Sequence, residues 1–224
     1  KCSKLINQSR YSGLYRLPVM RIDILKVLIA CECSGIIREA FRKNGHEAYS
    51  CDLKPDENNK SEFHIQDNVL NHLDKNWDLM IAHPVCTFIC RNRAMKNKLE
   101  NKEIDTSLFL KLLNADIPRI CIENPVPSKA ANLPKYNQII QPYYYGHDHS
   151  KKTCLWLKNL PKLKPTKLIK ITYVTTKNGY RYTKGWYNTP RNSTDRSRTF
   201  TGIANAMANQ WNKLSYNTTP LFPV

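Results

Sequence analysis

A cysteine and a glutamate, each directly after a run of apolar residues, are the side chains best placed for covalent chemistry. Cys86 follows the segment IAHPV, and Glu123 follows RICI. A cysteine thiolate can attack an electron-poor carbon, and a glutamate whose pKa is raised by burial can donate a proton. The alternatives are a buried structural thiol for Cys86 and a capping or turn acid for Glu123. The two residues together suggest a nucleophilic addition assisted by an acid.

A second set of polar residues lies around the segment ACECSGIIREAF. It is typical of a strand, a turn with one glycine and a helix, an arrangement that offers backbone N–H groups to a ligand. Asp52 follows Glu32 after the next apolar run, where an acid commonly binds ribose hydroxyls. Asp67 comes later, where an acid or amide could meet an adenine. A turn acid is the alternative for both aspartates. The segment lacks G-x-G-x-x-G, which argues against a simple NAD site.

The elements that must position these residues alternate between strands and helices. Apolar runs predict strands at 27–31, 47–51, 78–82, 119–122 and 153–157, and helical spacing predicts helices at 34–44, 106–114 and 203–214. This alternation indicates βαβ units and a mostly parallel sheet, whose ligands lie at the carboxyl ends of the strands. We therefore expect Glu32, Asp52, Cys86 and Glu123 to share one edge of the sheet.

A thiol and a carboxylic acid beside a pocket for a nucleoside-type cofactor suit one reaction well, the modification of cytosine at C5. C5 is a poor nucleophile until a thiolate adds at C6 and gives it enamine character. Protonation of N3 by a carboxylic acid helps that addition. C5 can then attack an electrophilic methyl group.

Positive charge indicates a polyanionic partner. The chain has 224 residues, with 35 Lys and Arg against 18 Asp and Glu, a net charge of +17. Residues 158–198 hold 7 Lys and 4 Arg against one Asp, and residues 1–26 hold six basic residues against one Asp. Residues 158–198 also contain interspersed tyrosines and a tryptophan. Cations beside aromatic rings suit phosphate contact and base stacking, so we expect a nucleic acid; a solvated basic hairpin is the alternative.

The composition excludes several other classes. Hydrophobic residues make up 41% and charged residues 24% of the sequence, as in globular proteins, and no apolar run has the length of a membrane helix. Several of the 8 cysteines lie in apolar runs, so we expect free thiols and an intracellular protein. A zinc site is an alternative use of the cysteines, but the usual CxxC pairs are missing, so we expect no metal.

The residues described so far resemble the cytosine-C5 DNA methyltransferases, in particular their short phage-type relatives. The resemblance covers about residues 25–160 and 197–212. ACECSG is similar to the first S-adenosylmethionine motif of the family, HPVC to its Pro-Pro-Cys, and ENP to its Glu-Asn-Val/Pro. YGHDHSKKTCLWL resembles the Tyr-Gly-…-Gln-x-Arg-x-Arg strand, and ANAM resembles the late Gly-Asn-Ala-Val segment.

This resemblance implies a fold, a cofactor and a substrate. The fold is α/β, the Rossmann-like fold of S-adenosylmethionine-dependent methyltransferases. Its core is expected at 25–157 plus 199–214, after a basic segment at 1–24, with a small β-rich inserted lobe at 158–198. The enzyme would act as a monomer in the cytoplasm, or in the host-cell cytoplasm if phage-encoded. It would methylate a cytosine flipped out of double-stranded DNA, under a mobile loop at residues 87–105.

The resemblance also assigns residues to these roles. Cys86 would be the nucleophile, Glu123 the proton donor to N3, and Lys151 a further catalytic group. Contacts with S-adenosyl-L-methionine are implied for Cys31, Glu32, Ser34, Gly35, Asp52, Leu53, Asp67, Asn68, Pro84, Asn205 and Ala206. With the basic and aromatic composition, it implies DNA contacts for Arg91, Arg93, His149, Lys151, Lys184 and Trp186.

Departures from the family motifs motivate two other hypotheses. His149, Lys151 and Thr153 stand where Gln, Arg and Arg are expected, Val85 replaces a proline, and Ala204 replaces a glycine. A lysine offers a point charge without the fork of an arginine, and loss of the second arginine weakens the expected support of the glutamate. One alternative is a related pyrimidine-modifying enzyme with another donor, or with a nucleotide or RNA substrate. The other is a catalytically weak DNA-binding homologue.

Overall fold

The computed structural model describes residues 24–59, 61–87, 89–91, 103–190 and 192–212. Expectations for residues 1–23 and for most of the segment 87–105 therefore lie outside the described residues. The strands are β1 Lys26–Ala30, β2 Glu47–Asp52, β3 His64–Gln66, β4 Leu79–Ala82, β5 Ile120–Pro125, β6 Gln138–Ile140, β7 Thr153–Lys158, β8 Tyr173–Thr175 and β9 Arg181–Thr183. The α-helices are α1 Ile36–Lys43, α3 Ser107–Leu113, α4 Lys184–Asn188, α5 Ser193–Ser197 and α6 Thr201–Gln210.

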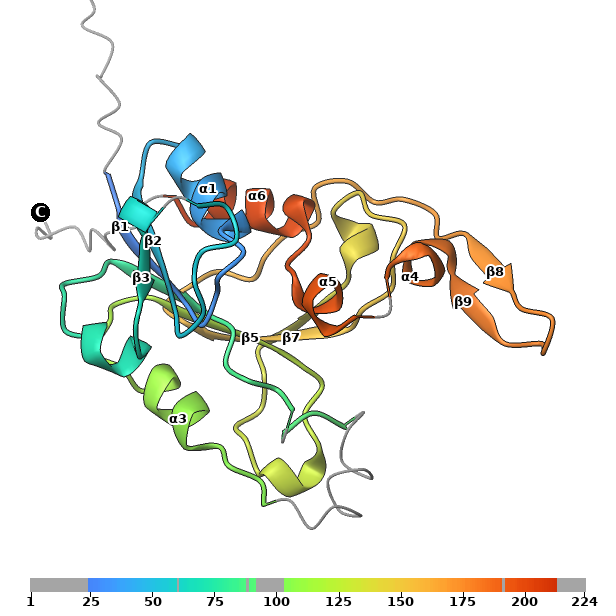
Figure 1. Ribbon diagram of the computed structural model, residues 1–224, viewed down its shortest axis with the longest axis horizontal. Helices are drawn as coiled ribbons and strands as arrows, with labels where there is room; N and C mark the ends of the chain where they lie inside the picture. The colour runs from blue at the N-terminus through green and yellow to red at the C-terminus, as the bar shows by residue number, and fades with distance from the viewer. Residues whose placement is uncertain (1–23, 60, 88, 92–102, 191, 213–224) are drawn as a thin grey trace, which may run out of the picture.

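Seven strands form one mixed but mostly parallel sheet in the order β3-β2-β1-β4-β5-β7-β6 (Figure 1). The pairs from β3 to β5 are all parallel, and β7 runs antiparallel to both β5 and β6. The predicted α/β class and mostly parallel sheet are therefore confirmed. The order reverses between β1 and β4, and in sheets of this kind ligands bind beyond the carboxyl ends of the strands at such a point.

Alternating side chains of β1 build a hydrophobic core on each face of the sheet. Val27 and Ile29 belong to one buried cluster, which includes residues of α1 and α6. Leu28 and Ala30 belong to a second cluster, which includes Phe109 of α3. Figure 1 shows α1 and α6 beside each other on one face and α3 on the other. Helices on both faces explain why the strands read as continuous apolar runs.

Several predicted boundaries differ from those of the structure, including the start of α1, which lies at Ile36 and not at residue 34. β5 does not end at Ile122, because Glu123, Asn124 and Pro125 pair with residues of β7 and extend the strand to Pro125. The last helix begins at Thr201, two residues before the predicted start, and ends at Gln210. Residues 213–214 of the predicted helix lie outside the described residues.

The segment 158–198 is less rich in strands than expected. Its strands β8 and β9 form a two-stranded antiparallel sheet of their own, and the five-residue helices α4 and α5 follow. Figure 1 shows the β8–β9 hairpin projecting away from the seven-stranded sheet. We call residues 158–198 the basic lobe. Of the described helices, none combines the length and the apolar character needed to cross a bilayer.

Candidate active site

Adjacent strands hold the thiol and the carboxylate. Cys86 lies on the loop that leaves β4, and Glu123 lies in β5, which pairs with β4 at Ala82 and Ile122. The side-chain amide of Asn124, 1% exposed, donates a hydrogen bond to the Pro84 carbonyl at 3.0 Å. This buried contact fixes the loop that carries Cys86 against β5.

The environment of Glu123 opposes the expected rise of its pKa. Burial alone would raise the pKa of this carboxyl. His83 Nδ1, 3.0 Å from Oε2, donates a hydrogen bond, and this bond, the charges of His83 and Lys151, and a hydrogen bond from Thr153 together lower the pKa. Glu123 is therefore a carboxylate in the free protein, and the condition considered for a direct proton donor, a pKa raised by burial, is not met. Thr153 therefore gives the Glu123 carboxylate part of the support that an arginine at this position was expected to give.

The thiol of Cys86 is shifted in the opposite direction. Burial is the main cause that raises its pKa, and the nearby Cys90 and Glu123 add to the rise. Lys151 lowers it by a smaller amount. The resting site therefore holds a protonated thiol beside an ionised carboxylate.

Lys151 lies close enough to act on both groups. Its charge acts on both Cys86 and Glu123, so the three predicted catalytic residues lie within electrostatic range of one another. Its Nζ donates a hydrogen bond to the Arg196 carbonyl at 3.0 Å. Its backbone N–H donates to the side chain of Gln141 at 2.9 Å. Lys151 therefore links the sheet edge to the basic lobe.

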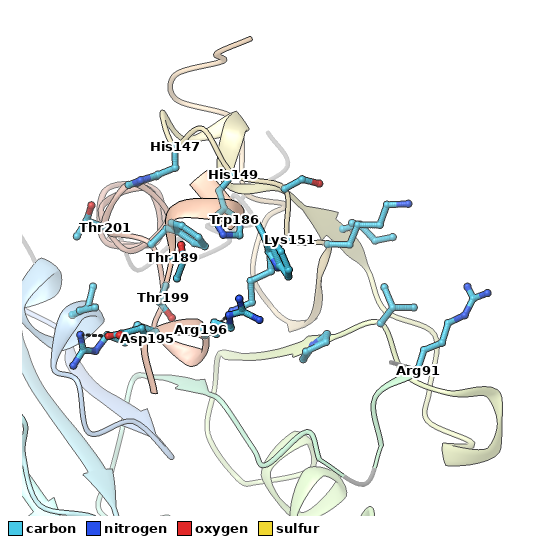
Figure 2. Close-up of a pocket in the computed structure, with 18 of the residues that line it drawn as sticks. Arg91, His147, His149, Lys151, Trp186, Thr189, Asp195, Arg196, Thr199 and Thr201 are labelled. Atoms are coloured by element: carbon cyan, nitrogen blue, oxygen red, sulfur yellow. Dashed lines mark hydrogen bonds and ion pairs between the residues drawn. The ribbon is translucent and has the colours of Figure 1, made fainter. Parts of the chain in front are cut away.

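A cavity of about 1120 Å³ lies between the sheet edge and the basic lobe (Figure 2). Five arginine or lysine side chains and one aspartate line it, so it favours an anion. The predicted DNA-binding residues Arg91, His149, Lys151 and Trp186 are among its lining residues. Lys184 is not among them, and Arg93 lies outside the described residues. The cavity is also lined by residues that the sequence did not single out: Arg196, Arg198, His147, Phe200 and Lys152.

Aromatic rings form one wall of this cavity. The rings of Trp186 and Tyr182 stack at 4.5 Å and 13°, and the Arg196 guanidinium lies 4.6 Å from the Trp186 ring centroid. The rings of His149 and Phe200 lie 4.9 Å apart. Burial is the main cause that lowers the pKa of His149, so its ring is neutral near pH 7. Flat neutral rings beside cations suit a planar, anionic ligand.

Glu32 and Ser34 build the turn between β1 and α1. The Glu32 carboxylate accepts hydrogen bonds from the Ser34 hydroxyl and, at 3.1 Å, from the Ile36 backbone N–H. Glu32 therefore caps α1 and takes one of the N–H groups that were expected to meet a ligand. Gly35 has φ 69°, and a Cβ there would lie 2.5 Å from the Arg38 guanidinium. The glycine is needed because both its backbone conformation and the packing exclude a side chain.

The predicted ribose and adenine acids lie at the next two strand ends. Asp52 ends β2 and accepts the Lys54 N–H at 2.9 Å. Asp67 accepts the Asn68 N–H at 2.6 Å and a hydrogen bond from His72, and these contacts lower its pKa. Both acids thus make the turn contacts considered as the alternative. The side chain of Leu53, directly after Asp52, is 73% exposed.

The remaining predicted cofactor residues differ in their environments. Cys31 has φ 58°, and burial, with Asp52 and Cys51, raises its pKa to about 12. The Asn68 side chain accepts the Leu70 N–H at 3.1 Å. On α6, Asn205 is exposed, whereas Ala206 is buried in the cluster shared with α1. Ala206 therefore packs in the core.

An arginine connects the loop after β2 with the basic lobe. Arg198 donates to the Glu57 carboxylate at 2.7 Å and to the Asp195 carboxylate at 3.1 Å. The Glu57 backbone N–H donates in turn to the Cys33 carbonyl at 3.0 Å. The lobe and the turn after β1 are thus joined through one side chain. Within the described ranges, no group of three or more His, Cys, Asp or Glu side chains is arranged to hold a metal ion.

Comparison with known proteins finds similarity to solved structures. No family model and no curated protein matches the sequence. The structure of a methyltransferase of Entamoeba histolytica, EhMeth, is similar over 66% of this chain, with 16% identity and a TM-score of 0.45. The matched part spans 58% of the length of that protein.

Proposed function

We propose that this protein transfers a methyl group from S-adenosylmethionine to C5 of cytosine in double-stranded DNA. The observation that carries the proposal is the placement of Cys86, Glu123 and Lys151 within electrostatic range of one another at the carboxyl edge of the sheet. The basic, aromatic-lined cavity that includes Lys151 supports a nucleic-acid substrate.

The three residues would prepare the base for substitution. As the Cys86 Sγ–C6 bond forms, the thiol loses its proton and N3 of the base gains one, so the adduct forms without a net change in protons. Lys151 favours the thiolate that attacks, because its charge opposes the influences that raise the Cys86 pKa. Glu123 would hand the proton to N3. After substitution, C5 loses its proton to solvent and the Sγ–C6 bond breaks.

The strand ends also fit the proposed cofactor. The exposed Leu53 offers an apolar surface beside the carboxylate of Asp52, and the carboxylate of Asp67 follows at the next strand end. An apolar face flanked by carboxylates suits an adenosine with its ribose hydroxyls. S-adenosylmethionine supplies an electrophilic methyl group when bound. Asp52, Leu53 and Asp67 would hold its nucleoside part.

Duplex DNA would have to present its cytosine outside the base stack. Base flipping costs a few kcal/mol for lost stacking and pairing. The wall formed by Trp186 and His149 and the cations Arg91 and Arg196 support such a substrate, since they suit stacking and phosphate contact.

The test is mass spectrometry of nucleosides after incubation of purified protein with S-adenosylmethionine and four substrates: duplex DNA, single-stranded DNA, RNA and free nucleotide. The expected product is 5-methylcytosine in duplex DNA. Product in RNA or nucleotide alone, or a pyrimidine of another mass, would replace the proposal with a related pyrimidine-modifying enzyme. Duplex binding without product from any substrate would indicate a DNA-binding homologue.

Binding to DNA is expected to weaken steeply with salt. The logarithm of the affinity should fall linearly with the logarithm of salt concentration, with a slope near −0.9 per phosphate contact. Removing Lys152, an exposed side chain at the cavity, should reduce that slope by about one. Lys43→Ala is the matched control, because this exposed lysine ends α1 and is not among the residues that line the cavity. Fluorescence anisotropy at several salt concentrations measures both slopes, and salt-independent binding contradicts the assigned DNA surface.

A further inference from the structure

Three titratable side chains lie at the ends of three neighbouring strands. Glu32 follows β1, His83 follows β4, and Glu123 lies in β5, and these strands are adjacent in the sheet. The His83 backbone N–H donates to the Ala30 carbonyl at 2.9 Å, which fixes it beside β1. Its Nδ1 lies 3.0 Å from Glu123 Oε2, and the two side chains are 14% and 18% exposed. His83 thus lies between two carboxylates.

The outer atoms of this row have no hydrogen-bond partner. His83 Nε2 and Glu32 Oε2 are buried, and neither has a partner among the residues that the structure describes. The charges of Glu32 and His83 nevertheless act on each other. Buried polar atoms without partners are rare because they lose their hydrogen bonds to water and gain none in the fold. Their presence here calls for an explanation, and a site that moves a proton supplies one.

We propose that His83 and Glu123 share one proton, and that His83 stores the proton which Glu123 delivers to N3 of the target base. The inference rests on the proposed function, because it takes N3 as the acceptor. It adds His83 as the positioning residue that keeps Glu123 supplied with a proton.

The transfer balances. In the proposed resting pair, both ring nitrogens of His83 carry protons and Glu123 carries none. The Nδ1–H bond of His83 breaks as the Glu123 O–H bond forms, which leaves a neutral ring with its proton on Nε2. The O–H bond then breaks as N3–H forms. The proton that leaves the Cys86 thiol then restores the pair to its one-proton state. When the adduct collapses, the N3 proton returns to the thiol by the reverse route. Over one turnover the pair has no net gain or loss of protons.

The charges around His83 determine the pH range of this pair. Glu32 faces it from β1, Glu123 from β5 and Cys86 from its own loop, while Lys151 acts through Glu123 from the segment before β7. Two carboxylates, one thiol and one ammonium group are thus the charged or titratable groups around the pair. A coupled pair retains its single proton to higher pH than a lone carboxyl would.

His83→Asn tests the proposal through its pH profile. Asparagine can still donate an N–H to Glu123 but cannot carry the proton. At pH 8, kcat/KM should fall by about 100-fold, as for loss of a general acid. The deficit should shrink as the pH falls, because Glu123 then takes up a proton itself, so the alkaline limb moves to lower pH. An equal loss at every pH would indicate a structural role and overturn the proposal.

His46→Asn is the matched control, because His46 is also buried but precedes β2 at the opposite edge of the sheet. It should leave the alkaline limb in place, even if the protein is less stable. A limb that moves equally in this control would contradict the assignment to His83.

A second measurement does not depend on activity. In ¹⁵N NMR of the free protein with labelled histidine, the His83 ring should lose its proton at lower pH in Glu123→Gln than in the wild type. An unchanged His83 titration would overturn the shared proton. A changed titration with no cytosine product would support the pair while removing N3 as its acceptor, so the two failures are distinguishable.

Discussion

Cys86→Ala is expected to reduce cytosine modification to background. Without a nucleophile at C6, C5 stays unactivated, so the rate should fall by about 10⁶-fold, the lower end of enzymatic accelerations. Cys90, the next thiol along the chain, does not replace it because its side chain is only 6% exposed. Mass spectrometry of nucleosides measures the loss of product.

The covalent adduct itself can be trapped with S-adenosylmethionine and duplex DNA that contains 5-fluorocytosine. Fluorine replaces the C5 hydrogen, so no proton can leave C5 after methyl transfer and the Sγ–C6 bond cannot break by elimination. Wild-type protein should remain attached to DNA on a denaturing gel, and Cys86→Ala should not. Cys90→Ala is the matched control, a buried thiol without an assigned role, and it should still form the adduct. An adduct formed by Cys86→Ala would refute this residue as the nucleophile.

Arg38→Ala is expected to cause the largest loss of stability. Arg38 is 0% exposed and donates to Ser50 Oγ at 2.7 Å and to the Asp56 carboxylate at 3.2 Å. The Asp56 side chain is itself only 4% exposed, so the substitution removes the guanidinium from a carboxylate that stays buried. Breaking a buried ion pair in this way costs about 3–5 kcal/mol. The free energy of unfolding in urea measures it.

Arg42→Ala provides the comparison on the same helix. Arg42 is half-buried, lies 3.2 Å from the centroid of the Phe63 ring and donates to the Ala48 carbonyl at 3.4 Å. Losing such a contact should cost about 1 kcal/mol. Equal losses of unfolding free energy in the two variants would mean that the buried Arg38 contributes no more to stability than the half-buried Arg42 does.

Local pattern was sufficient to predict the strands that carry the site. The apolar runs before Glu32, Asp52 and Cys86 are strands whose ends share one edge, as expected, because each run must be buried between helices. The extent of β5 was not predictable in this way. Its last residues are strand only because β7 pairs with them, from a segment about thirty residues later.

Electrostatic properties of the site depend on contacts that the sequence does not show. The direction of the Glu123 pKa shift follows from His83, directly after β4, and from Thr153, on β7, and neither is adjacent to Glu123 in sequence. The cavity likewise needs the lobe to fold back, which brings Arg196 and Arg198 to the sheet edge. The composition of the lobe indicated a basic surface but not which cations would face the site.

The Arg198 bridge also bears on how far the protein is modular. Arg198 belongs to the basic lobe, whereas Glu57 belongs to the loop that follows Asp52 and Leu53. Both partners are partly exposed, so the bridge contributes at most about 1 kcal/mol. Even a small coupling between the lobe and this loop acts in both directions. A ligand bound at the lobe and a ligand bound at the strand ends change each other's affinity by the same factor. A lobe transplanted from another protein to change specificity would therefore also alter the affinity for the proposed cofactor, unless the graft carried an arginine to meet Glu57.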